Sequence, residues 1–158
     1  SSYDPLKTDA LNKLQKPSII YLMGTDDVGR DIFTRVMIGI RVSLLIGLSV
    51  TMISTIFGMC IGIIAAYYKN TEKFLMRIVD GIMAFPSIIL AIVLAGILGA
   101  GTKNIIVALS ISYIPTLARV TRNATLEVLS KEYVESAIVL GKSDIYIIFN
   151  YIIPFKIM

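Results

Sequence analysis

Two long stretches without a charged residue constrain this chain more than any other feature. Residues 42–68 and 81–102 contain no Asp, Glu, Lys or Arg, and about 20 apolar residues are enough to cross a bilayer as a helix. A third uncharged run, residues 104–118, reaches that length only if its helix continues past Arg119, whose long side chain can extend to the interface. The sequence therefore predicts an all-α integral membrane protein whose transmembrane helices cover about 42–68, 81–102 and 104–122.

The composition excludes several other classes of protein. Hydrophobic residues make up 56% of the chain and charged residues 16%, whereas soluble domains have roughly 45–50% and 25%. There is no histidine, and the single cysteine, Cys60, lies in an apolar run, so we expect no metal site, no cofactor and no disulfide within the chain. The net charge of +4 is spread over loops, which indicates membrane orientation and not nucleic-acid binding.

The sequence GTDDVGRD, residues 24–31, matches the pattern of a phosphate-binding loop except at its last two positions. Its glycines have the spacing of such a loop, but Arg30 and Asp31 stand where Lys and Ser or Thr are required. Three aspartates would also face the anionic phosphates. We expect a glycine turn in which Asp31 caps the following helix and pairs with Arg35. The residues up to position 41 are expected to lie outside the bilayer as an irregular segment and an interfacial helix.

Small residues recur every four positions in the first expected span, which lines them along one face of the helix. Such a face lets a second helix approach closely, although glycines are also common in membrane helices without this role. We expect the helix-packing residues to be Ser54, Gly58, Gly62 and Ala66. Pro86 and Pro115 are expected to interrupt the second and third spans, because proline removes a backbone hydrogen bond.

Charge alone leaves the orientation of the chain open. The loops after the first and third expected spans are basic and would lie on one side of the membrane, which marks that side as cytoplasmic. Three arginines at the opposite end of the first span, Arg30, Arg35 and Arg41, favour the reverse orientation.

Residues 130–154 predict two short helices joined by a tight turn. Ser130 is placed to cap the first helix, and Gly141 can end it by adopting a positive φ. Ser143, followed by Asp144, can cap the second helix, which Pro154 would end. The expected product is a rigid projection suited to being held by another protein.

This region resembles the EAA loop of binding-protein-dependent ABC importer permeases. The resemblance lies in Glu135-Ser136-Ala137, then three residues, Gly141, nine residues, and the closing Tyr-Ile-Ile-Pro that ends at Pro154. Three positions depart from that pattern: Ser136 for Ala, Tyr151 for Ile and Ile153 for Leu. Residues 24–47 and 80–92 resemble the dipeptide, oligopeptide and nickel branch of the family. The signature residues are Gly24, Thr25, Asp26, Gly29, Arg30, Asp31 and Arg41.

The resemblance implies a permease-type bundle of six helices in the bacterial plasma membrane, of which this chain holds the second to fourth. Residues 1–41 would be extracytoplasmic, residues 42–129 would hold the transmembrane helices, and residues 130–154 would form a cytoplasmic coupling loop. Residues 155–158 depart from the family's usual Pro-Asn continuation and are expected to be a truncated tail of a fragment.

The resemblance also implies partners and a function. The chain would be no enzyme, since ATP hydrolysis would occur on separate ABC ATPase subunits. Further partners would be a second homologous permease subunit in a heterodimer and an extracytoplasmic substrate-binding protein. The substrate would be a peptide, nickel or a related small solute. The residues implied to contact the ATPase are Glu132, Glu135, Ser136, Ala137, Gly141 and Pro154.

Other interpretations stay open on the residues alone. The glutamates of the loop could be the solvated face of an interfacial helix. The chain could also belong to a channel or secondary transporter that works without an ATPase, although the two long spans lack the buried ionisable residues usual in such proteins. An ATPase would need a phosphate loop, and a bare membrane anchor would not explain the EAA spacing.

Overall fold

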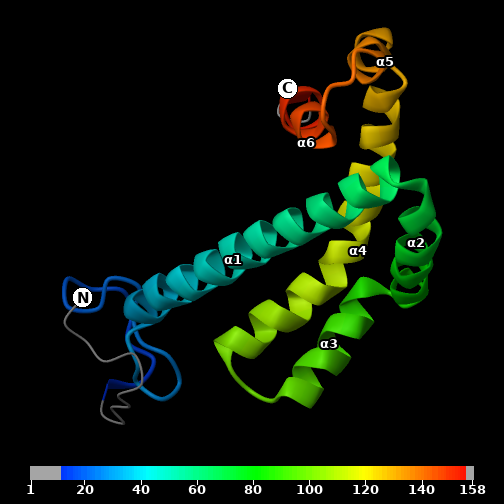
Figure 1. Cartoon of the computed structure of the whole chain (residues 1–158). Coiled ribbons are helices and arrows are strands. Elements are labelled where there is room, and N and C mark those ends of the chain that lie inside the picture. Colours follow the sequence, from blue (N-terminus) through cyan, green and yellow to red (C-terminus); the bar gives the residue numbers. More distant parts are fainter. Residues whose placement is uncertain (1–11, 156–158) are drawn as a thin grey trace. The chain divides into compact units, whose positions relative to one another are not determined.

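The computed structural model describes residues 12–155, and the elements named within them are all helical apart from one isolated bridge between Thr25 and Asp31. Residues 1–11 of the expected extracytoplasmic segment and residues 156–158 of the expected tail lie outside the described part. The chain divides into two compact units, Ser1–Leu48 and Ser49–Met158, and each is described by itself. The all-α membrane fold expected from the uncharged runs is confirmed (Figure 1).

The first unit contains a folded turn that precedes a long helix. The backbone N–H of Leu14 donates to the carbonyl of Asp26 at 3.1 Å, and the N–H of Thr25 donates to the carbonyl of Gln15 at 3.1 Å. Gly24 has a φ of +75°, and a Cβ there would lie 2.3 Å from the carbonyl oxygen of Gln15. Only glycine fits this position, because any side chain would meet fixed backbone.

Helix α1 (Ile32–Tyr67) has 36 residues. At 1.5 Å per residue it is about 54 Å long, which exceeds the roughly 30 Å of hydrocarbon in a bilayer. The expected interfacial helix and the expected first span are therefore one continuous helix. Within the described residues, α1 and α4 (Thr102–Leu129) are the two helices long and apolar enough to cross a membrane alone.

Helices α2 (Lys69–Met83) and α3 (Ser87–Leu98) form a third candidate span only as a bent pair. Their axes meet at 85°. The break lies at residues 84–86, where Pro86 lacks an N–H and disfavours helical geometry at Phe85. The expected interruption at Pro86 is confirmed. Residues 81–83, which were expected to begin the second span, belong to α2.

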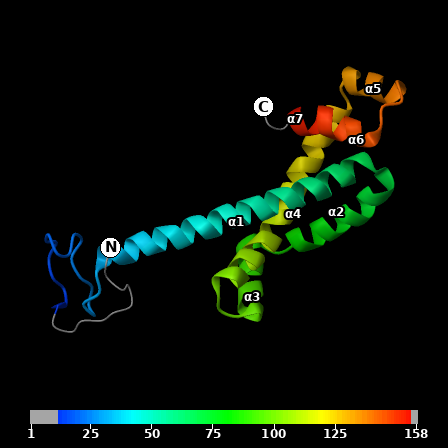
Figure 2. The same cartoon turned by 60° about the vertical axis from the view of Figure 1, so that its left-hand side comes forward.

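Helix α4 continues through Pro115 without interruption, contrary to expectation. Pro115 is fully buried, so packing around it holds the helix together despite the missing hydrogen bond. Both α2 and α3 pack against α4 (Figure 2). In the second unit α4 is therefore the helix around which the others gather.

Four short helical segments follow α4. They are α5 (Glu132–Val139), α6 (Asp144–Ile147), a π-helical turn η2 (Ile148–Ile152) and α7 (Ile153–Phe155). The last three run on without a break, so the second expected helix continues past Pro154 instead of ending there. The wider π turn before Pro154 relieves the clash between a proline ring and the carbonyl four residues earlier.

Candidate functional site

Helix α5 separates its residues cleanly into an inward and an outward face. Val134 and Ala137 point inward and are buried. Glu132, Glu135 and Ser136 are exposed on the other side. Because residues three apart share a helix face, this division presents both glutamates to whatever lies outside the second unit.

A Schellman turn ends α5. Gly141 has a φ of +73°, and its N–H donates to the carbonyl of Ile138 at 2.9 Å. The N–H of Lys142 donates to the carbonyl of Ala137 at 3.2 Å. This pair of bonds is the usual way in which a glycine in the left-handed region closes a helix, so the expected positive φ at Gly141 is confirmed.

The next helix begins with a side-chain cap. The hydroxyl of Ser143 accepts a hydrogen bond from the N–H of Tyr146 at 3.4 Å, as expected. The expected cap at Ser130 is wrong. Ser130 follows the end of α4 and donates its hydroxyl to the carbonyl of Glu127 at 2.8 Å, so Lys131 precedes α5 and no side chain caps that helix.

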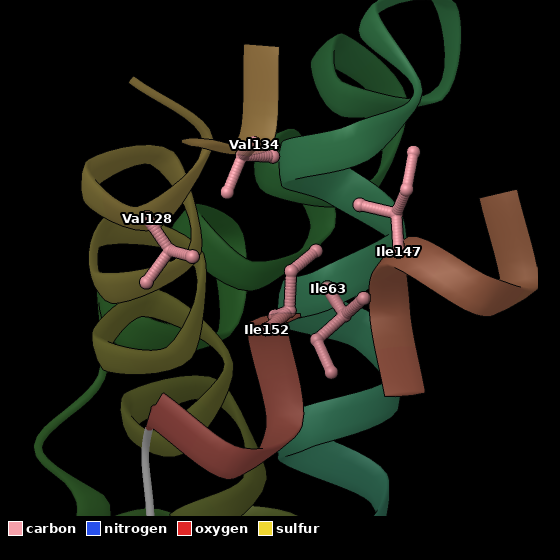
Figure 3. Packing of buried hydrophobic residues seen from close by; sticks show 5 residues of the cluster. All are labelled: Ile63, Val128, Val134, Ile147 and Ile152. Atoms are coloured by element: carbon pink, nitrogen blue, oxygen red, sulfur yellow. The ribbon is translucent and has the colours of Figure 1, made fainter. Parts of the chain in front are cut away.

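A buried apolar cluster fixes the two short helices to the ends of α1 and α4. Figure 3 shows the five side chains converging, with one from α1, one from α4, one from α5, one from α6 and one from η2. Four of them have no more than 1% of their surface exposed. Burial of each such side chain contributes roughly 1.5–3 kcal/mol, which makes the region a packed unit. The members are Ile63, Val128, Val134, Ile147 and Ile152.

Hydrogen bonds add a polar link beside this cluster. The hydroxyls of Tyr67 and Tyr68 donate to the two carboxylate oxygens of Asp144, at 2.9 Å and 3.1 Å. The hydrogen bond to Asp144 raises the pKa of Tyr68 above its ordinary value, because the neutral phenol is the form that can donate. The start of α6 is thereby tied to the junction between α1 and α2. Sequence reasoning noticed Asp144 only as a helix-start charge and missed this link.

The tip of the projection is apolar and exposed. Val139, Leu140, Ile145 and Phe149 each have more than 60% of their surface exposed. They follow one another along the end of α5, the glycine turn and the helical stretch after it. Large exposed apolar side chains beside charged ones are typical of surfaces that contact another protein or a membrane. Pro154 is also exposed, near the other end of the stretch.

The small-residue face of α1 lies against α4 in the second unit. A Cβ at Gly58 would stand 2.6 Å from the Cβ of Leu117, and a Cβ at Gly62 would stand 2.5 Å from the carbonyl oxygen of Ala118. Ser54 is buried and donates its hydroxyl to the carbonyl of Ser110 at 3.3 Å. Ala66, the last member of the face, is buried as well. At Gly58 and Gly62 the backbone of α1 therefore packs directly against α4, with no room for a side chain.

In the first unit the turn at residues 24–31 is filled by its own carboxylate. Asp26 Oδ1 accepts the N–H of Val28 at 3.0 Å and that of Arg30 at 2.9 Å, while Oδ2 accepts the Nε of Arg30 at 2.7 Å. Burial opposes ionisation, yet these hydrogen bonds and the Arg30 charge lower the pKa of Asp26 to about 2. The amides that would cradle a phosphate are occupied by an anion of the chain itself.

The remaining signature residues divide into two groups. Gly24, Thr25 and Gly29 are buried in the turn, and Arg41 lies exposed further along α1. The expected cap is confirmed: Asp31 Oδ2 accepts the N–H of Thr34 at 3.1 Å. The expected pair between Asp31 and Arg35 is wrong, because Arg35 reaches Asp26 instead, at 3.4 Å.

Two ion pairs between α2 and α4 were not expected from the sequence. Arg122 Nε donates to Glu72 Oε1 at 3.0 Å, and a second bond joins the same two side chains. Arg119 pairs with Asp80 and is therefore not extended away from the protein. No local pattern signals these pairs, since each joins residues that are far apart in the chain.

Comparison with known proteins adds independent information. Residues 58–155 match the family model described as binding-protein-dependent transport system inner membrane component. A peptide transport system permease protein of Brucella suis biovar 1 is 43% identical over 150 residues, which cover 95% of this chain and 51% of that protein. A glutathione transport system permease protein of Pectobacterium atrosepticum is 40% identical over 147 residues, 92% of this chain and 48% of that protein. A dipeptide transport system permease protein of Alkalihalophilus pseudofirmus is 39% identical over 155 residues, which cover 98% of this chain and 50% of that protein. The chain spans about half the length of these curated relatives.

Proposed function

The chain belongs to the family of binding-protein-dependent transport system inner membrane components, and from this premise we propose that it is part of the permease subunit of an ATP-driven peptide importer. It is a multi-pass protein of the bacterial plasma membrane. In this proposal α1 to α4 form part of the translocation pathway. Residues 130–154 are the cytoplasmic coupling loop, and residues 1–41 are extracytoplasmic.

The two-sided construction of α5 is the observation that carries the coupling role. Val134 and Ala137 anchor the helix on the second unit, while Glu132 and Glu135 are left facing outward. A connector of this kind can transmit a displacement, because its inner face is packed and its outer face is free for a partner. The exposed apolar tip provides desolvated contact area beside the charges.

The partner that fits this surface is an ABC ATPase subunit, which would hydrolyse ATP on its own chain. A change in contacts between two states of that partner would shift the permease between outward and inward access. Movement of α5 would reach α1 and α4 through the buried cluster and the hydrogen bonds of Asp144. A second homologous permease subunit and an extracytoplasmic substrate-binding protein complete the proposed importer.

Peptides are the substrate class we propose. The three relatives described above are named for peptide, glutathione and dipeptide transport. None of these three names refers to nickel.

Two substitutions at Gly141 test the coupling role in the complete importer. Gly141→Val forces a β-branched side chain into the left-handed region and breaks the turn, although a Cβ there has no atom within 4 Å. Gly141→Asn keeps the turn, because asparagine tolerates this conformation. We expect the valine variant to lose ATPase co-purification and ATP-dependent uptake of a radiolabelled dipeptide, and the asparagine variant to keep both. If the valine variant keeps both, the coupling assignment is wrong.

A further variant separates the importer from a channel or secondary transporter. In the complete importer, an ATPase subunit that binds ATP without hydrolysing it should abolish dipeptide uptake. Uptake that continues with this disabled ATPase would overturn the proposal in favour of a route without ATP.

A further inference from the structure

An open cleft of about 660 Å³ lies between α2 and α4 in the second unit. Seven of its eight lining residues are polar or charged, and it has no place in the coupling role described above. Four basic side chains and two acidic ones line it, which leaves an excess of two positive charges. Only those cations of the cleft that have no ion pair within the protein remain available to a ligand.

The two carboxylates of the cleft are already used. Glu72 pairs with Arg122 and Asp80 pairs with Arg119, so each acidic group of α2 is neutralised by an arginine of α4. Lys73 and Arg77 have no ion pair among the residues that the structure describes. The excess positive charge of the cleft therefore rests on these two side chains.

Their spacing makes this charge costly without an anion. Lys69, Lys73 and Arg77 follow one another at four-residue intervals on α2, and like charges at this spacing destabilise a helix. An anion bound between Lys73 and Arg77 would turn this repulsion into attraction. A phosphate suits the arrangement, because its oxygens accept charge-assisted hydrogen bonds from both lysine and arginine.

An apolar surface accompanies the cations on the same helix. Phe74 and Ile78 directly follow Lys73 and Arg77 in sequence and are 68% and 47% exposed. One residue is about 100° of helix rotation, so an apolar row runs beside the basic row. Helices with adjoining basic and apolar faces lie at membrane interfaces, and the bend before α3 allows α2 to leave the direction of a spanning helix.

We propose that the cleft between α2 and α4 binds the phosphate group of an anionic membrane lipid, with Lys73 and Arg77 as its cationic ligands. The acyl chains of the lipid would lie along Phe74 and Ile78. Basic pockets between membrane helices on the cytoplasmic side are a recognised place for such headgroups. The proposal takes from the proposed function only that this end of α2 and α4 is cytoplasmic, and it does not depend on the transported substrate or on the coupling role.

Native mass spectrometry of the intact protein in detergent tests this site. The probes are dioleoyl phosphatidylglycerol and dioleoyl phosphatidylcholine, which share their acyl chains and differ in net headgroup charge. We expect the protein to retain phosphatidylglycerol in preference to phosphatidylcholine. The double variant Lys73→Gln/Arg77→Gln should weaken phosphatidylglycerol binding roughly thirtyfold, which is about fivefold for each cation.

Two matched variants control for the loss of net charge and for the change of side chain. Lys103→Gln/Lys142→Gln removes the same charge from exposed positions outside the cleft and should bind as the unaltered protein does. Lys73→Arg/Arg77→Lys keeps both charges and should also bind, while far-UV circular dichroism verifies that the glutamine variant keeps its helices.

The outcomes separate the possible sources of the phosphate. Displacement of phosphatidylglycerol by excess inorganic phosphate would support the phosphate site and assign it to free anions. Resistance to displacement would support the lipid. Equal retention of the two lipids, or equal binding by the two glutamine variants, would overturn the proposal. Lipid binding and peptide uptake are measured in separate experiments. Failure of this site is therefore distinguishable from failure of the proposed function.

Discussion

Tyr67, the last residue of α1, donates a 2.9 Å hydrogen bond to Asp144, the first residue of α6. The bond joins positions that are 77 residues apart in the chain. With the neighbouring bond from Tyr68, it is a polar connection between the projection of α5 and α6 and the membrane helices. The buried cluster makes the other connection. The two can be separated experimentally, because a phenylalanine keeps the ring and loses the hydroxyl.

We expect Tyr67→Phe/Tyr68→Phe to loosen α6 without unfolding it. Loss of two exposed hydrogen bonds to a carboxylate should make the opening of α6 severalfold faster. Hydrogen exchange of the backbone amides in residues 144–152 measures this change. Tyr133→Phe is the control, since its hydroxyl has no hydrogen bond among the described residues. Equal exchange in the two variants would show that the hydroxyls of Tyr67 and Tyr68 do not hold α6 in place.

The link at Asp144 also predicts a dependence on alkaline pH. The pKa of Tyr68 is raised above 10.0 by the hydrogen bond that it donates. A raised pKa means that the stabilisation is complete below about pH 10.0 and is lost as the pH rises through the folded-state value. We expect Asp144→Ala to return the pKa of Tyr68 toward 10.0. Absorbance titration of the phenolate, taken as the difference from a Tyr68→Phe protein, measures the shift.

The contact between α1 and α4 predicts that even one methyl group at Gly62 is harmful. The new Cβ would lie 2.5 Å from the carbonyl oxygen of Ala118 and 2.6 Å from the Cβ of Thr121, so the helices must separate. Such overpacking costs about 1–3 kcal/mol. Unfolding in mixed detergent and dodecyl sulfate, followed by circular dichroism, should show this loss for Gly62→Ala.

Gly96→Ala is the matched control for that substitution. Gly96 also lies within a helix, but a Cβ there has no atom within 4 Å. Alanine restricts the unfolded chain more than glycine does, so we expect an unchanged or slightly higher stability. Equal destabilisation of the two variants would show that the loss at Gly62 does not come from close packing.

The ion pairs between α2 and α4 predict different coupling energies. Glu72 and Arg122 keep 27% and 25% of their side-chain surface exposed, whereas Asp80 and Arg119 keep 61% and 44%. Solvent screens the second pair more strongly. A double-mutant cycle with Glu72→Gln and Arg122→Gln should give about 0.5–1 kcal/mol. The corresponding cycle for Asp80 and Arg119 should give nearly zero, and the reverse order would contradict this ranking.

Local chemistry explains why the sequence predicted some parts of the fold well. The positive φ of Gly141, the cap of Ser143 and the cap of Asp31 depend on residues within a few positions, so the sequence holds all the information they need. The break at Pro86 is likewise a property of proline itself. The prediction at Ser130 was wrong because α4 runs on to Leu129 and turns the hydroxyl back toward its own carbonyls.

Contacts between distant helices were beyond the sequence pattern. The bonds of Asp144 with two tyrosines, and the pair of Glu72 with Arg122, depend on which helices become neighbours. A charged residue offers several possible partners, and only the packing of α2 on α4 selects one. Arg35 illustrates this at short range, since it bypasses Asp31 at the helical spacing and reaches Asp26 in the folded turn.

The turn of the first unit predicts that one aspartate matters and its neighbour does not. Asp26 accepts the N–H groups of Val28 and Arg30 and the guanidinium of Arg30, whereas Asp27 is exposed. Asp26→Asn places an amide N–H₂ against the guanidinium, where two donors repel each other. We expect several-fold faster exchange of the Val28 and Arg30 amides in this variant and no change in Asp27→Asn.

The same turn should respond to acid at a low pH. The pKa of Asp26 is lowered from 3.8 to about 2, and a lowered pKa stabilises the folded turn above about pH 3.8. This stabilisation is lost as the pH falls through about 2, because the protonated carboxyl no longer holds the guanidinium. Carbon-13 shifts of labelled aspartate carboxyls follow the titration in detergent. A midpoint for Asp26 near 3.8 would mean that the carboxylate does not fill the turn in solution.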